Sequence, residues 1–215
     1  QQYAKIAYAN TVLSTVDKVE GTAQDKQRLT KDAHMLRAYE FFQLATLYCL
    51  PYSEQNRSRL GLPLKRTLSY SEDVSRKSLG ETMDFIANEI DLALETDELR
   101  DPADIWRISK PAVQAFAARF YLYLHDYDKA LAFANDALNA HSTLVNTQAY
   151  FAPHMRVYNS SGGTYTGPNA PSNFKFDEFC YSRMLYNHTQ NAVPSQSLLN
   201  LYDQTNDYRY EAYIV

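Results

Sequence analysis

The spacing of hydrophobic positions predicts a chain built from helices. Between residues 3 and 19, apolar side chains recur every three or four positions, the period of one helix face, until Gly21 interrupts the pattern. A second helical pattern, for which Thr30 is a suitable N-cap, runs to about Leu50 and stops before Pro51. Its expected inward positions are Ala33, Leu36, Phe41, Leu44, Ala45 and Tyr48.

The sequence also predicts a third helix, whose start is marked by a capping pattern. Ser78 is followed three residues later by Glu81, the pattern of a capping box, and the apolar period then continues to Leu94. A loop over residues 96–109 follows and contains the only tryptophan of the chain.

Residues 112–140 predict two antiparallel helices joined at Asp126-Tyr127, in the pattern of a tetratricopeptide (TPR) repeat. Small residues at the expected contact positions let two helix backbones approach closely, and Tyr121 fills the wedge between them. The small positions are Ala118, Ala130, Ala134 and Ala137. A TPR hairpin is a scaffold, so this pattern favours a protein that holds or presents a partner.

Long irregular stretches separate and follow these helices. Residues 51–75 are rich in Ser, Arg and Pro, and residues 142–194 include a Gly/Ser/Pro/Asn-dense segment at 159–173. Residues 174–186 fit a short strand or a helical turn, and Ser195 is expected to cap a short helix. We therefore expect one all-α domain over residues 1–215, with TPR-like helix pairs and long loops.

Composition excludes some classes of function. The 215 residues carry a formal net charge of −4, which argues against a nucleic-acid partner. No apolar run approaches the roughly 20 residues of a membrane span. The chain starts and ends inside regular patterns, so we expect a fragment or processed form of a larger protein. Its 18 tyrosines serve helix packing, and tyrosine is also suited to binding sugars or peptides.

The sequence shows almost no pattern that is typical of a catalytic site. The five histidines are scattered, and no zinc-protease, P-loop or dinucleotide-binding motif is present. Asp203, Asp207 and Glu211 form an acidic group without the spacing of a calcium loop. We therefore expect no enzyme activity, no metal and no cofactor. A disulfide between Cys49 and Cys180 stays open at this stage.

Five segments in sequence order resemble the SusD/RagB family of outer-membrane lipoproteins from Bacteroidetes-type bacteria. The most telling is KDAHMLRAYEFFQLATLYCLPY (31–52), a helix that ends in a "Y(G)xPY" stop, with Cys49-Leu50 where glycine is usual. The other segments are YAKIAYANTVLSTV (3–16), GLPL (61–64) with SRKSLGETMDFIANEIDLAL (75–94), the TPR-like pair (110–138), and VPSQSLLNLYDQTNDYRYEAY (193–213).

The resemblance implies a nutrient-binding protein on the cell surface. Such proteins capture an oligosaccharide, or in some members a peptide, and pass it to a TonB-dependent transporter of the SusC type. It also implies an outer-membrane location through an N-terminal lipid anchor that is not part of this sequence. TPR helices in the family pack largely toward the transporter, and irregular loops hold the ligand.

Aromatic side chains on loops are the candidates for glycan contact. Flat rings stack on the C–H faces of sugars, and Arg, Asn and Asp hydrogen-bond to hydroxyls. The candidate ligand-binding residues are Trp106, Arg107, Tyr70, Arg156, Tyr158, Asn159 and Tyr165.

Two other functions stay open. A TPR-type module that binds a peptide or protein would need about three stacked repeats, and only one pair fits well. A glycosidase would need two carboxylates in a cleft, for which the sequence offers no candidate pair.

Overall fold

The computed structural model describes residues 2–144, 146, 178–181, 195–203 and 205–206. The chain divides into two compact units, residues 1–142 and 143–215, and each is described by itself. A single domain over 1–215 stays a prediction.

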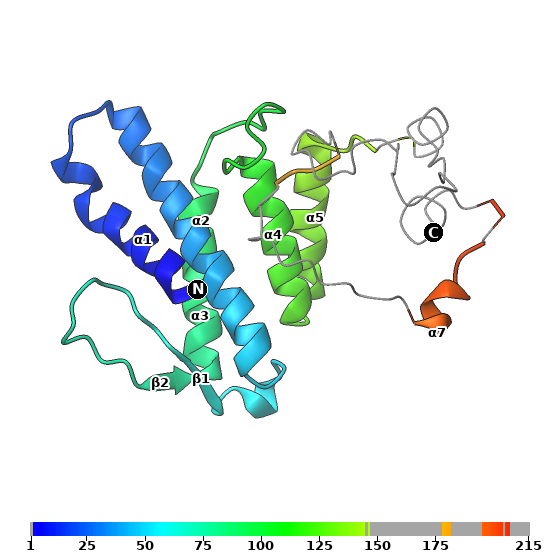
Figure 1. The fold of residues 1–215 in the computed structure, drawn as a ribbon, viewed down its shortest axis with the longest axis horizontal. Coiled ribbons are helices and arrows are strands. Elements are labelled where there is room, and N and C mark those ends of the chain that lie inside the picture. Colours follow the sequence, from blue (N-terminus) through cyan, green and yellow to red (C-terminus); the bar gives the residue numbers. More distant parts are fainter. Residues whose placement is uncertain (1, 145, 147–177, 182–194, 204, 207–215) are drawn as a thin grey trace, which may run out of the picture. The chain divides into compact units, whose positions relative to one another are not determined.

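The expected all-α architecture is confirmed. In the first unit, α1 (Gln2–Thr15), α2 (Ala23–Tyr48) and α3 (Leu79–Leu94) pack together, and α4 (Lys110–Tyr123) pairs with α5 (Tyr127–Ala140) (Figure 1). Two short 3₁₀ helices cover Val16–Lys18 and Glu54–Asn56. The core between the helices is aromatic, with ring contacts that link Phe42 of α2 to Phe116, Phe120 and Tyr123 of α4.

The predicted start of α2 was wrong. The N-cap is Thr22, whose side chain accepts a hydrogen bond from the Asp25 backbone N–H, and Thr30 lies inside the helix, where its hydroxyl donates to the Lys26 carbonyl. Tyr48 was also expected to point inward, but its side chain is 67% exposed because α2 ends at this residue. The other expected inward positions of α2 are buried or half-buried.

The predicted starts of three other helices are confirmed. Ser78 and Glu81 form the complete capping box of α3. Asp126 caps α5 by accepting a hydrogen bond from the Lys129 backbone N–H. In the second unit, Ser195 caps α7 (Gln196–Leu199) in the same way.

The TPR-like hairpin of α4 and α5 packs as expected. Tyr121 is buried, and its ring stacks on Phe133 with centroids 5.6 Å apart. Ala130 and Ala137 are buried on the face of α5 that lies against α4. His125 closes α4 with a φ of 61°, in the left-handed region, so the hairpin turns within three residues.

A small sheet occupies part of the stretch expected to be irregular. Strand β1 (Leu60–Pro63) pairs antiparallel with β2 (Arg76–Ser78), with Leu60 opposite Ser78 and Pro63 opposite Arg76. The sheet lies against α2 and α3. Neither strand shows an apolar alternation long enough to be recognised from sequence.

Several expectations fall on residues outside the described part. These are most of 174–186, the loop 159–173, and Asp207 and Glu211 of the acidic group. None of the described helices combines the length and apolar character that crossing a lipid bilayer requires. Cys49 is a free thiol.

Candidate functional site

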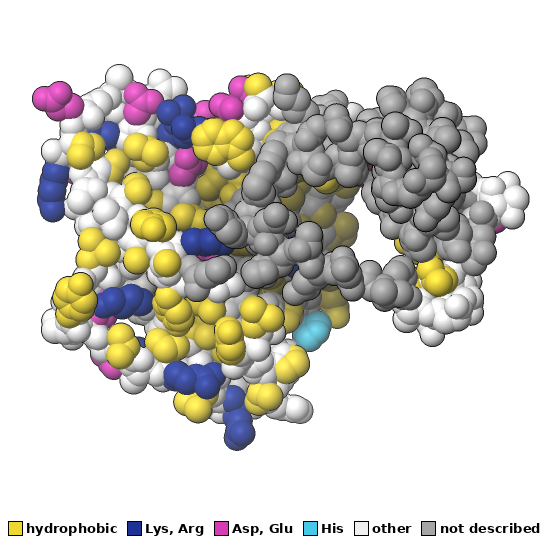
Figure 2. Space-filling view, viewed as in Figure 1, with side chains coloured by type: hydrophobic (Ala, Val, Ile, Leu, Met, Phe, Trp, Pro, Cys, Tyr) yellow, Lys and Arg dark blue, Asp and Glu magenta, His cyan; other side chains and the backbone are white. Residues whose placement is uncertain are grey.

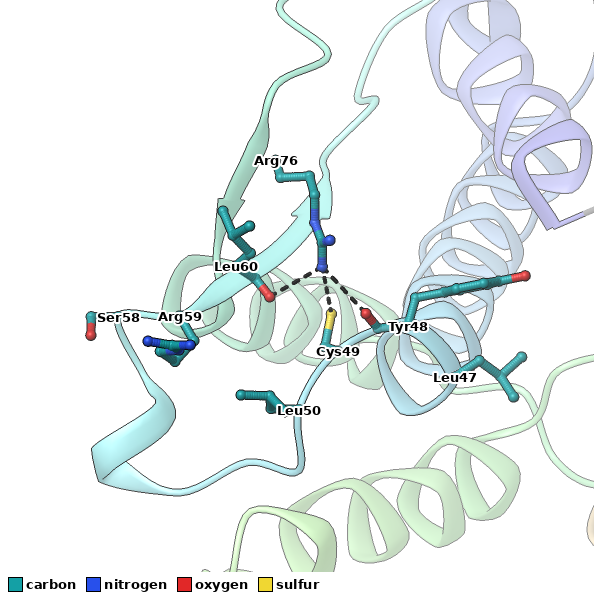
Figure 3. Close-up of a pocket in the computed structure, with 8 residues that line it drawn as sticks. All are labelled: Leu47, Tyr48, Cys49, Leu50, Ser58, Arg59, Leu60 and Arg76. Carbon is teal, nitrogen blue, oxygen red and sulfur yellow. Dashed lines mark hydrogen bonds between the residues drawn. The ribbon is translucent and has the colours of Figure 1, made fainter.

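A pocket of about 680 Å³ opens where α2 ends and β1 begins. It is lined by Leu47, Tyr48, Cys49, Leu50, Ser58, Arg59, Leu60 and Arg76 (Figure 3). Pro51 ends α2 and turns the chain outward, so the last turn of the helix forms one wall. The segment that leads into β1 forms the other wall.

Arg76 joins the two walls of this pocket. Its Nε donates to the Gly61 carbonyl at 2.6 Å, and its Nη2 donates to the carbonyls of Leu60 at 3.2 Å and Tyr48 at 3.3 Å. The Tyr48 carbonyl lies at the C-terminus of α2, where carbonyls lack partners within the helix. Arg76 therefore caps α2 and fixes β1 beside it.

The sulfur of Cys49 lies 4.0 Å from Nη2 of Arg76 (Figure 3). Burial raises the pKa of the Cys49 thiol, and the hydrogen bond and charge of Arg76 oppose that effect. Because the net direction is upward, the thiol stays protonated and uncharged at neutral pH.

The pocket is apolar and basic. Its eight lining residues include two arginines and neither aspartate nor glutamate. Figure 2 shows hydrophobic and basic side chains together over the lower part of the first unit, whereas most acidic side chains visible on that face lie at its upper end. Such a site favours a ligand that offers both an apolar face and negative charge.

A second group of interest lies on the loop before α4. Trp106 is 51% exposed, and the Arg107 guanidinium lies over its ring, 4.8 Å from the centroid. Nη1 of Arg107 is also 3.5 Å from Oδ2 of Asp32 on α2. The neighbouring side chains Ile105 and Ile108 are buried and anchor the loop, so the exposed ring is held on a fixed support.

Burial raises the pKa of Asp32 to about 6, although Arg107 and Arg28 oppose the shift. Because the folded pKa lies above the unfolded value, the contribution of Asp32 to stability is present at low pH and is lost as pH rises through about 6. A quarter of the side chain is exposed, and solvent screening limits the effect to about 1–2 kcal/mol.

We therefore expect the free energy of unfolding of Asp32→Asn, relative to the parent protein, to increase by that amount between pH 4 and pH 7. The measurement is urea unfolding at several pH values. A difference that stays constant with pH would contradict the shift.

The structure brings only part of the predicted ligand set together. Trp106 and Arg107 are in contact, whereas Tyr70 is fully exposed on the loop between β1 and β2 and touches neither. Arg156, Tyr158, Asn159 and Tyr165 lie outside the described residues, so their role stays a prediction.

Sequence reasoning missed the pocket of Arg59 and Arg76. Its lining comes from three short segments, 47–50, 58–60 and 76, which no local pattern links. Within the described part of the chain, no group of His, Cys, Asp and Glu side chains could hold a metal ion.

Comparison with known proteins places this fold in context. A family model described as SusD-like, "starch-binding associating with outer membrane", matches residues 1–122. A SusD-like carbohydrate-binding protein from Bacteroides vulgatus superposes with a TM-score of 0.62 at 23% identity, covering 73% of this chain and 33% of that one. No curated protein matches the chain.

Two further solved structures are similar. A SusD superfamily protein from Bacteroides thetaiotaomicron has a TM-score of 0.62 at 21% identity, covering 74% of this chain and 36% of that one. A laminarin-binding SusD-like protein has a TM-score of 0.54 at 22% identity, covering 67% and 30%. The chain thus spans about a third of the length of these structures, and at such identities the likeness establishes the fold.

Proposed function

This chain belongs to the SusD-like family, and on that premise we propose that it is part of a nutrient-binding protein that captures oligosaccharide or polysaccharide. The match of the family model over residues 1–122, more than half of the chain, carries the proposal. The exposed ring of Trp106 on an anchored loop supports it, because an aromatic face of this kind stacks on sugar C–H groups.

We further propose that the captured glycan is delivered to a TonB-dependent transporter of the SusC type and that the full protein is lipid-anchored on the outer surface of the outer membrane. Both statements follow from the family. We also propose that the protein binds its ligand without hydrolysing it, which agrees with a described pocket lining that offers no carboxylate for general acid or nucleophilic catalysis.

The alternative is a TPR-type module that binds a peptide or protein. Such modules stack about three repeats at a constant period. Among the described residues, α4 and α5 match the repeat pattern, whereas α1, α2 and α3 pack together without it and the loops between the helices differ in length. This arrangement favours glycan capture.

Replacing Trp106 with alanine tests the proposal. We expect binding of the preferred polysaccharide to weaken about tenfold, because a stacking ring is lost, and the variant to stay folded with a lower melting temperature, because half of the side chain is buried. The measurement is a glycan binding screen followed by calorimetric titration of the best binder.

A matched control is Tyr127→Ala, which removes another exposed aromatic side chain from the start of α5. It should leave glycan affinity unchanged. Saturable binding of a peptide, with no glycan bound, would overturn the proposed function in favour of the interaction module.

A further inference from the structure

The pocket at the end of α2 combines two cationic side chains with apolar walls. We propose that it binds an anionic sugar unit, so that the captured glycan is an acidic oligosaccharide bearing carboxylate or sulfate groups. This inference rests on the proposed function and specifies the class of its ligand.

Arg76 has a hydrogen-bond donor and a positive charge that a ligand could use. Its Nε and Nη2 donate to backbone carbonyls, and its Nη1 makes no hydrogen bond to a described residue. Neutral carbonyls satisfy donors without cancelling the positive charge of the guanidinium. The same bonds hold the side chain in place, so an anion would meet a preorganised cation.

Arg59 supplies the second charge. It forms no ion pair with a carboxylate in the described part of the chain, and neither does Arg76. Nearby Arg57 behaves differently, because its guanidinium contacts Asp84 at 2.8 Å and 3.1 Å. Arg57, which lies beside the pocket, thus has a carboxylate partner, and the two pocket arginines have none among the described residues.

The apolar walls favour a sugar ring over a bare anion. Leu50 and Leu60 are exposed and lie on the same side of the end of α2 as the two arginines, whereas Leu47 and the Tyr48 ring point away from them (Figure 3). Leu50 and Leu60 therefore form the apolar wall beside the arginines. A free phosphate or sulfate ion would gain nothing from these side chains. A pyranose ring has apolar C–H faces that can cover them while its charged substituent reaches the arginines.

The structural role of these arginines at the end of α2 accounts for only one of the two positive charges. The C-terminus of α2 carries a partial negative charge, which Arg76 offsets by binding the Tyr48 carbonyl. One arginine is enough for that structural role. Arg59 makes no side-chain contact of this kind, so its charge remains available to a ligand.

The test is calorimetric titration of the protein with two matched pairs of ligands. One pair is oligogalacturonide and its methyl ester, which differ only in the carboxylate charge. The other is a sulfated galactan oligosaccharide and its desulfated form. We expect one charged member to bind at least tenfold more tightly than its neutral counterpart, and its affinity to fall between 50 and 200 mM salt. The two pairs distinguish carboxylate from sulfate as the recognised group.

Arg59→Gln should weaken binding of the charged ligand roughly tenfold and leave the neutral one unchanged. The matched control is Arg119→Gln, which removes one positive charge from an exposed position on α4 that does not line the pocket. It should change neither affinity. Arg76→Lys serves as a second variant, which keeps the charge but loses the forked geometry.

Each other outcome has a defined meaning. Equal affinity for the charged and neutral members would overturn this inference and leave glycan capture standing. A charge preference that both arginine variants retain would overturn the assignment to this pocket. Tighter binding of an acidic peptide than of any glycan would overturn the ligand class. Binding of no glycan at all would overturn the proposed function as well.

Discussion

The free energy of unfolding of the Arg37→Met variant is expected to be about 3–5 kcal/mol lower than that of the parent protein. Arg37 and Glu89 form a bidentate ion pair, with N–O distances of 2.8 Å and 2.5 Å, and their side chains are only 9% and 2% exposed. Removing the arginine leaves the Glu89 carboxylate buried with His34 as its remaining partner, at 2.9 Å.

Arg37 also binds groups other than Glu89. Nη1 of Arg37 donates to Oδ1 of Asn10 on α1 at 3.0 Å and to the Arg66 carbonyl at 3.3 Å. Asn10 in turn donates to the Lys65 carbonyl at 3.2 Å. Arg37 of α2 therefore joins α1, α3 and the segment after β1, and its loss leaves several buried polar groups without partners.

Burial opposes ionisation of Glu89, but hydrogen bonds from His34 and Arg37 outweigh it and hold its pKa below the usual value. The carboxylate is thus charged at neutral pH, and the variant would carry that charge without its main partner. Urea unfolding at pH 7 measures the effect.

Two matched variants test this explanation. The double variant Arg37→Met/Glu89→Leu removes both charges and should be more stable than Arg37→Met alone. Arg119→Met makes the same substitution at an exposed position of α4 and should change stability by less than about 0.5 kcal/mol. A loss below about 1 kcal/mol for Arg37→Met would contradict a structural role for the pair.

Helix starts could be predicted where the signal is local. Ser78, Asp126 and Ser195 each cap a helix through a bond to a residue three positions along the chain, and such pairs are visible in the sequence. Thr22 follows the same rule with Asp25. The prediction of Thr30 overlooked that pair, so this error could have been avoided from sequence.

The buried polar residues of α2 could not be predicted in the same way. Lys31, Arg37 and Glu40 are buried, which interrupts the apolar period of the helix. Their partners come from other helices: Glu95 pairs with Lys31, and Lys5 lies 3.3 Å from Glu40. His34 is nearly buried for the same reason, with Glu89 of α3 as its partner. A single helix pattern carries no information about such contacts.

The pocket could not be predicted either, because its residues are brought together by contacts between segments far apart in the sequence. Arg76 reaches Tyr48 only because β2 pairs with β1, and β1 lies against α2. The strands have four and three residues, too few for a period to be recognised. Trp106 could be proposed as a candidate from sequence because a lone large ring on a loop is unusual, whereas Arg59 and Arg76 are ordinary arginines until the fold places them in one pocket.

Gly61 is the residue on which this arrangement depends most closely. Its Cα faces the start of α3, where the Thr82 hydroxyl donates to the Ser78 carbonyl at 2.9 Å and accepts from the Leu62 N–H at 3.0 Å. A Cβ at position 61 would overlap the Thr82 hydroxyl and the Ser78 carbonyl oxygen, and would lie 2.7 Å from the carbonyl carbon. Most of these atoms are backbone and cannot move aside.

We therefore expect Gly61→Ala to lower the free energy of unfolding by about 2–4 kcal/mol. The methyl group must push β1 away from α3, which breaks the bond to the Leu62 N–H. It also displaces the carbonyls of Leu60 and Gly61 that hold Arg76. The same variant should therefore lose the affinity of the pocket for a charged sugar. Thermal and urea unfolding measure stability, and the galacturonide titration measures the pocket.

Gly80→Ala is the matched control, because it makes the same substitution only two residues after β2. There the new Cβ meets Cγ and Nε of Arg57 at 2.6 Å and 3.0 Å and its carbonyl oxygen at 3.3 Å, so the closest contact is with a side chain that must shift and not with backbone. Position 80 is also in the first turn of α3, where alanine is favoured over glycine, so the change should cost less than Gly61→Ala. An equal loss of unfolding free energy in the two variants would contradict this explanation. It would mean that β1 can move away from α3 at little cost and that its position does not hold Arg76.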